Sequence, residues 1–143
     1  MKWILDESDI LKQVEHLRLE ASKNLDNEKK SSLRQYFSTS SLASLMASML
    51  DFRGKEIRIL DPGAGIGSLF AACIQKIVQK RVRPESVYVT AYEVDKSLNI
   101  YLENTFEICN KVCKKVGIRF EKELIEDDFI QDSARRFGLS SPI

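Results

Sequence analysis

The chain has 143 residues, which suits one domain and is short for two. Hydrophobic residues make up 43% and charged residues 30%, as in soluble globular proteins, and the net charge of +1 excludes an overall basic field for nucleic acid. No apolar stretch reaches the roughly 20 residues of a membrane span, the acidic start lacks a signal-peptide core, and three cysteines fit a reducing, cytoplasmic setting without a membrane partner.

The first part of the chain is predicted to be helical. Residues 1–33 contain no Gly or Pro, and their apolar spacing indicates an amphipathic helix over Asp9–Ala21. A second helix is predicted after "QYFST", with Ser and Thr as N-caps and Gly54 as its stop. Its apolar residues at helical spacing are Leu42, Leu45, Met46, Met49 and Leu50.

Strands and helices then alternate. Short β-branched or apolar runs predict strands at 56–60 and 86–95 and a third within 118–129. Helices are predicted between them, over 68–82 and 96–116. This order argues for an α/β fold with a parallel sheet and right-handed crossovers.

The segment "ILDPGAGIGSL" joins the first strand to the next helix through Gly63, Gly65 and Gly67. Such a turn presents backbone N–H groups and a positive helix end to a ligand. The dinucleotide pattern G-x-G-x-x-G would need a third glycine at Ser68. Asp61 heads the loop and disfavours a pyrophosphate, so an amino group or a sulfonium is the better neighbour.

Acidic residues also end the other two strands. Glu93 follows the second strand, where a carboxylate can accept from both ribose hydroxyls. In "EDDF", Asp127 and Asp128 precede Phe129, so an acid can accept from an adenine amino group beneath an aromatic ring. Because parallel strands deliver these acids to one sheet edge, the sequence predicts a site for S-adenosylmethionine.

Each of these features also has a plain structural interpretation. Asp61 can cap a turn, the glycines can serve helix–strand packing, Glu93 can be a solvated strand end, and Asp128 can cap a helix. Cys109 and Cys113 lack further ligands nearby, so no metal is expected and burial is the simpler interpretation. The basic residues that either complement a helix dipole or meet DNA phosphates are Lys76, Lys80, Arg81 and Arg83.

At this point the chain resembles a known family, the adenine-specific DNA methyltransferases of restriction–modification systems of the Eco57I and BsuBI/PstI kind. The motifs that carry the resemblance are "RQYFSTSSLASLMASML", "ILDPGAGIGSL", "AYEVDKSLNIYLENT" and "EDDFI", between Arg34 and Ile130. The resemblance implies a class I, Rossmann-like methyltransferase fold with an incomplete sheet. It divides the chain into an N-terminal helical segment, 1–33, and a partial cofactor-binding domain, 34–143.

The resemblance also assigns site residues by matching positions. The family's order, with the cofactor segment first, is its gamma type. Where members read Thr-Pro, this chain has Ser38-Thr39, which keeps a hydroxyl and loses a proline. The implied cofactor-binding residues are Tyr36, Phe37 and Ser38 near the methionine end, Asp61, Gly63, Ala64 and Gly65 in the loop, Glu93 at the ribose, and Asp128 and Phe129 around the adenine.

The family's catalytic "NPPY" segment is absent from this sequence, so no catalytic residue is assigned. We therefore expect an inactive cofactor-binding portion of an enzyme that meets DNA through regions further downstream. Without a fourth strand the first strand becomes a sheet edge, for which self-association is predicted, unless the N-terminal helix covers the sheet. Two alternatives stay open: a methyltransferase for RNA, protein or a small molecule, and a non-catalytic association module.

Overall fold

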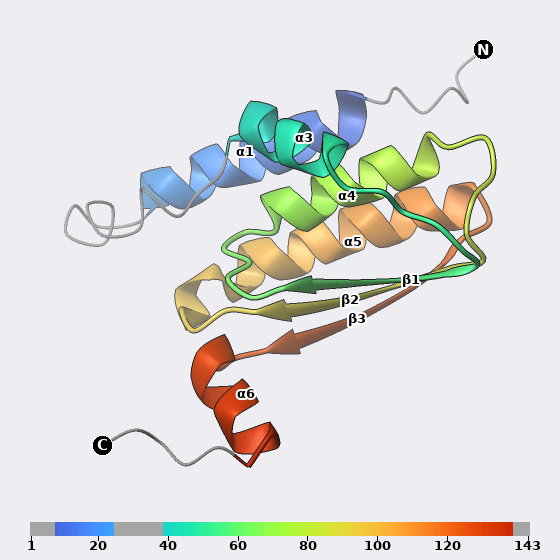
Figure 1. Cartoon of the computed structure of the whole chain (residues 1–143). Helices are drawn as coiled ribbons and strands as arrows, with labels where there is room; N and C mark the ends of the chain where they lie inside the picture. Colours follow the sequence, from blue (N-terminus) through green and yellow to red (C-terminus); the bar gives the residue numbers. More distant parts are fainter. Residues whose placement is uncertain (1–7, 25–38, 139–143) are drawn as a thin grey trace.

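The computed structural model describes residues 8–24 and 39–138 (Figure 1). Tyr36, Phe37, Ser38 and the proposed boundary after residue 33 lie outside the described residues. The elements are α1 (Ser8–Asn24), α3 (Ser40–Ser48), β1 (Glu56–Asp61), α4 (Ser68–Val78), β2 (Ser86–Tyr92), a short 3₁₀ helix η2 (Lys96–Leu98), α5 (Asn99–Lys115), β3 (Arg119–Ile125) and α6 (Phe129–Arg136).

The three strands form one parallel sheet in the order β1-β2-β3, so the described part of the sheet has β1 at one edge. Helices α4 and α5 lie over one face of the sheet, and α1 and α3 lie beyond them as a further layer (Figure 1). The predicted α/β class is confirmed, and the arrangement is consistent with a Rossmann-like methyltransferase fold. Helix α1 contacts α4 and α5, so it packs over the sheet through these two helices.

The core lies between the sheet and its helices. Val87 and Val89 of β2 alternate with half-buried residues, because successive side chains of a strand point to opposite faces. Phe70 of α4 stacks on Phe106 of α5, with ring centroids 4.8 Å apart. Cys73, Cys109 and Cys113 are free and buried in this core, where burial raises the pKa of Cys113 to about 12.

The other face of the sheet carries polar side chains. Arg58 of β1 lies over the ring of Tyr88, whose hydroxyl donates to Glu123 of β3 over 3.0 Å. Leu60 of β1 is 54% exposed on the edge strand. Strand β2 pairs with both β1 and β3, so it is the interior parallel strand of the described sheet, although Tyr88 and Thr90 on this face are only half-buried.

Helix α3 is confirmed, but it buries a different face from the one that its large apolar residues indicated. Ala43 and Ala47 are buried, whereas the five Leu and Met residues on and just after α3 are 40–71% exposed. Small alanine side chains let the helix backbone approach α4 closely. The helix ends at Ser48, well before Gly54. At this end the Lys76 ammonium of α4 donates to the carbonyls of Ala47 and Ser48 over 3.2 and 3.3 Å.

Local hydrogen bonds also move other element ends. Helix α4 ends at Val78 and not at residue 82, and Arg83 Nε donates to the Val78 carbonyl at this end over 2.8 Å. Strand β2 ends at Tyr92, and a helix, α6, follows Asp128, for which the only sequence signal was Asp128 as a possible cap. Lys76 and Arg83 donate to carbonyls at the ends of α3 and α4, which favours helix-end stabilisation over phosphate contact for these two residues. Lys80 donates to the Phe52 carbonyl in the segment after α3.

We expect Lys76→Met to lower the free energy of unfolding by about 1–2 kcal/mol, because charged hydrogen bonds to the carbonyls at the end of α3 are lost. Urea denaturation followed by circular dichroism measures the change. Lys111→Met, the same substitution at an exposed position of α5, is the control and should leave stability nearly unchanged. Equal effects of the two substitutions would contradict the capping role.

Candidate functional site

A cavity of about 420 Å³ lies at the carboxyl edge of the sheet. Ligands of open α/β sheets bind at this edge, and the volume is within the range of small-molecule pockets. Five of the residues that the sequence predicted lie together in its wall. The lining residues are Pro62, Gly63, Gly65, Tyr92, Glu93, Val94, Leu98, Asp127, Asp128 and Phe129.

The glycine-rich turn forms one side of the cavity. The Ala64 amide donates to the Tyr92 carbonyl over 2.9 Å, which joins the turn to the end of β2. The backbone then turns through left-handed conformations, with φ of 59° at Gly65 and 90° at Gly67, which favour glycine. Because its amide is used in this way and it does not line the cavity, Ala64 supports the turn from behind.

The glycines of the turn have different roles. A Cβ atom on Gly67 would lie 2.6 Å from Phe70 Cζ and 2.8 Å from Thr105 Cγ2. The Thr105 hydroxyl, which is fully buried, donates to the Ile66 carbonyl over 2.6 Å and fixes the same part of the turn to α5. A Cβ on Gly63 would meet nothing within 4 Å. Gly67 therefore serves packing, whereas Gly63 faces open space at the cavity.

Glu93 connects the turn to the end of β2. Its Oε1 accepts from the Gly65 amide over 2.8 Å, and its Oε2 accepts from the Asp95 amide over 2.9 Å. A carboxylate has about four lone-pair sites, so both oxygens keep capacity for a ligand hydroxyl. The solvated strand end that was the alternative for Glu93 is not what the structure shows.

Asp61 lies behind the turn and does not line the cavity. Its side chain is buried, and Oδ1 accepts a long hydrogen bond of 3.4 Å from the Gly63 amide. Oδ2 is buried without a hydrogen-bond partner among the residues that the structure describes. Burial, and then the nearby Glu93 carboxylate, raise the pKa of Asp61 to about 6, against the lowering effect of the Gly63 amide.

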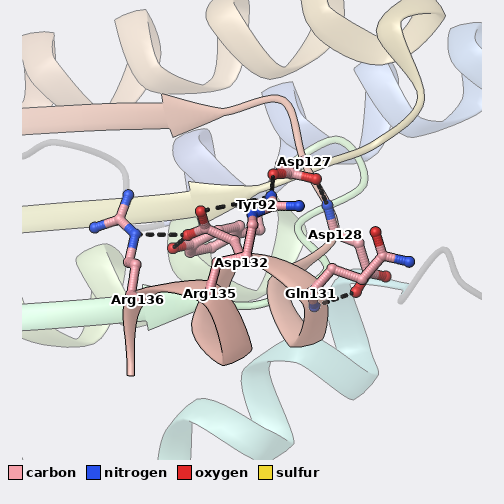
Figure 2. A network of polar contacts seen from close by, with 7 residues as sticks. All are labelled: Tyr92, Asp127, Asp128, Gln131, Asp132, Arg135 and Arg136. Carbon is pink, nitrogen blue, oxygen red and sulfur yellow. Dashed lines mark hydrogen bonds and ion pairs between the residues drawn. The ribbon is translucent and has the colours of Figure 1, made fainter. Parts of the chain in front are cut away.

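The start of α6, drawn in Figure 2, also lines the cavity, through Asp128 and Phe129. Asp128 is the N-cap of α6 and accepts from the Gln131 amide over 2.9 Å, as the helix-cap alternative predicted, and it also lines the cavity. The Phe129 ring meets Tyr92 edge to face, with centroids 5.2 Å apart. A capping carboxylate and an aromatic edge thus stand together at this wall.

Four lining residues were missed by the sequence interpretation: Pro62, Tyr92, Val94 and Leu98. The sequence signal that could have identified such residues is their position close to the carboxyl end of a strand, because residues there lie at the same sheet edge as Asp61 and Glu93. They add apolar and aromatic surface to a wall that otherwise carries three carboxylates. This combination suits a flat heteroaromatic group with hydroxyls and a cationic tail, and opposes a polyanion.

Two further searches of the described ranges, 8–24 and 39–138, bear on function. No cluster of three or more His, Cys, Asp or Glu side chains is placed to hold a metal ion there. No helix in these ranges has the length and apolar character needed to cross a bilayer.

Comparison with known proteins gives two relatives that cover most of this chain. It is 32% identical over 123 residues to the type II methyltransferase M.PstI of Providencia stuartii, which is 86% of this chain and 24% of that protein. It is 31% identical over 128 residues to the type II methyltransferase M.BsuBI of Bacillus subtilis, which is 89% of this chain and 24% of that protein. No protein-family profile matches.

The parallel sheet with a ligand-sized cavity at its carboxyl edge is an α/β arrangement that is consistent with a Rossmann-like methyltransferase fold. The chain is homologous to the type II methyltransferases over most of its own length, so the resemblance found in the sequence is confirmed at that level. It spans about a quarter of the length of these relatives.

We expect Gly67→Ala to destabilise the protein by about 2–3 kcal/mol, because a Cβ there meets Phe70 and Thr105 and the backbone is left-handed. Thermal and urea denaturation measure the loss. Gly63→Ala is the matched control in the same turn and should retain wild-type stability, since its Cβ meets nothing within 4 Å. Similar losses at both positions would show that the packing account is wrong.

Asp61 predicts a pH dependence of stability. Its pKa is raised from 3.8 to about 6 in the folded protein, so folding favours the protonated acid and the free energy of unfolding falls as pH rises from about 4 to 6. At pH 8 Asp61→Asn should therefore be more stable than wild type by about 2–3 kcal/mol, and the gain should vanish near pH 4. Urea denaturation across pH measures both.

The control for this prediction is Glu107→Gln, which neutralises an exposed carboxylate of α5. It should leave the shape of the stability profile unchanged. An Asp61→Asn variant that is less stable than wild type at pH 8 would contradict the buried, destabilising carboxylate.

Proposed function

We propose that this chain is the S-adenosylmethionine-binding part of a DNA adenine methyltransferase of a restriction–modification system, working in the cytoplasm. The observation that carries the proposal is the cavity in which Gly63, Gly65, Glu93, Asp128 and Phe129 converge. The homology to type II methyltransferases supports it at the level of the parent enzyme.

The residues present fit this cofactor. Glu93 would accept from the ribose hydroxyls, while Asp128 and the rings of Phe129 and Tyr92 would frame the adenine. The buried Oδ2 of Asp61, without a partner in the described residues, places unbalanced negative charge behind the turn, where the positively charged amino-acid end would be favoured. The cofactor supplies the methyl group, and these residues bind and orient it.

The rest of the reaction is assigned to the parent enzyme. Methylation of the adenine amino group requires the base to leave the duplex and to be held by stacking and hydrogen bonds. The sequence contains no "NPPY" segment for that role. We therefore propose that this chain alone transfers no methyl group, and that DNA is bound by other parts of the parent enzyme.

The domain division, 1–33 and 34–143, belongs to the same proposal, with Tyr36, Phe37 and Ser38 of the second part near the methionine end of the cofactor. A second candidate is an association module. The observation in its favour is that β1 pairs only with β2 in the described residues and exposes Leu60, so another chain can meet its free edge. A methyltransferase for RNA, protein or a small molecule is a weaker alternative, because the "QYFST" motif favours DNA.

We expect calorimetric titration with S-adenosylmethionine to show binding by wild type and at least tenfold weaker binding by Glu93→Ala. The truncation removes the acceptor for the ribose hydroxyls and the support of the Gly65 amide, and each charged hydrogen bond contributes about 1.5–3 kcal/mol. Glu121→Ala, an exposed acid on β3, is the control and should bind like wild type.

The same titration with NAD⁺ distinguishes the ligand class. The three carboxylates at the cavity should reject its pyrophosphate, so tighter binding of NAD⁺ than of S-adenosylmethionine would contradict the proposal. Methyl transfer to plasmid DNA by the purified chain would contradict its second part, the lack of activity.

A further inference from the structure

Helix α6 supplies one wall of the cavity but has little packing of its own. Asp128 and Phe129 at its start line the cavity, and no residue of the helix is buried. An eight-residue helix is marginal without tertiary contacts, because helix nucleation is costly. Something other than a buried apolar face must therefore hold this wall in place.

The contact that holds it is polar. The Tyr92 hydroxyl at the end of β2 donates to Asp132 Oδ2 of α6 over 2.6 Å (Figure 2). Asp132 is 14% exposed and also pairs with Arg136, whose Nε lies 2.8 Å from the same oxygen. The Tyr92 ring, which is 5% exposed, meets Phe129 on its cavity side.

A second ion pair joins the helix to the preceding turn. Arg135 pairs with Asp127, and the same guanidinium lies 3.9 Å from Asp132 Oδ1. Asp127 Oδ1 in turn accepts from the Asp128 amide over 2.7 Å. The network thus runs from Tyr92 of β2 through α6 to Asp127 and Asp128, which both line the cavity (Figure 2).

We propose that Tyr92 and Asp132 form a latch, defined as the hydrogen bond between their side chains, that positions the α6 wall and so sets the affinity of the cavity for an adenosine-containing ligand. This rests on the proposed function. Asp132 does not line the cavity, so its effect on a ligand is transmitted through Asp128 and Phe129. Asp132 is therefore a positioning residue. Tyr92 both lines the cavity and holds the helix.

The proposal depends on the free-energy cost of ordering α6 when a ligand binds. When the latch is broken, α6 loses its strongest link to β2 and opens locally, because it has no buried apolar residue to keep it closed. A ligand must then order the helix before it can use Asp128 and Phe129, and its apparent affinity falls by the fraction of molecules in which the wall is formed.

The test uses the whole chain and two pairs of variants. Tyr92→Phe removes the hydroxyl and keeps the ring, and Asp132→Ala removes its partner. Tyr88→Phe and Glu123→Ala are the matched controls, because Tyr88 lies on the same strand and its hydroxyl makes the same kind of contact, 3.0 Å from Glu123, away from the cavity. Titration calorimetry with S-adenosylmethionine gives affinity, and hydrogen exchange of residues 129–136 gives the opening of α6.

The expected result is about tenfold weaker binding and faster α6 exchange in both latch variants, with both controls like wild type, since a hydrogen bond to a charged acceptor contributes a factor of about ten or more. The double variant Tyr92→Phe/Asp132→Ala should bind no more weakly than the weaker single variant, because the two residues act through one bond.

Unchanged affinity in the latch variants would overturn the proposal. So would weaker binding with unchanged α6 exchange, because that result would make Tyr92 a direct ligand contact only. If wild type itself does not bind S-adenosylmethionine, the proposed function fails, and exchange alone decides the latch: faster α6 exchange in Tyr92→Phe than in Tyr88→Phe supports it, and equal rates overturn it.

Discussion

The hydrogen bond from the Gly65 amide to the Glu93 carboxylate ties the turn after β1 to the end of β2, and the shape of the candidate site depends on it. A turn with two left-handed glycines is conformationally free in the unfolded chain, so its position must be fixed from outside. Three contacts do this: the Glu93 carboxylate at Gly65, the Tyr92 carbonyl at Ala64, and the Thr105 hydroxyl at Ile66. A residue proposed to bind ribose is thus also part of the scaffold.

The arrangement of charge shows how the site and the stability of the fold oppose each other. Asp61 is buried near another carboxylate, and burial raises its pKa to about 6. A fold selected for stability alone would place an apolar or amide side chain there. Retaining an acid behind a turn that already carries Glu93 creates a negative environment at the carboxyl edge, which is the condition that a cationic ligand needs.

Much of this architecture was predictable, because strand–turn–helix order, apolar periodicity and the positions of acids after strands all follow from local sequence. The α/β class is confirmed, and Gly63, Gly65, Glu93 and Asp128 lie together in the wall of one cavity. Apolar periodicity does not reveal which face of α3 is buried. The buried face carries Ala43 and Ala47, whose small side chains allow close approach to α4. Nor does periodicity reveal α6, whose stability comes from polar contacts to Tyr92, a residue distant in sequence. Asp61 was expected at the carboxyl edge of the sheet together with Glu93 and Asp128, but it is buried behind the turn and does not line the cavity. How deeply a side chain is buried there depends on packing, which the sequence pattern does not reveal.

The two walls of the cavity therefore differ in kind. The glycine turn is held by buried contacts to the core, with Gly67 against Phe70 and Thr105, so it is formed whenever the domain is folded. The α6 wall has no buried residue and is held by the Tyr92–Asp132 contact and exposed ion pairs, so it can open without unfolding the sheet. It follows that the rigid wall fixes where the ribose end of a nucleoside would lie. On the proposal made above, the α6 wall decides how tightly the base of that nucleoside would be held.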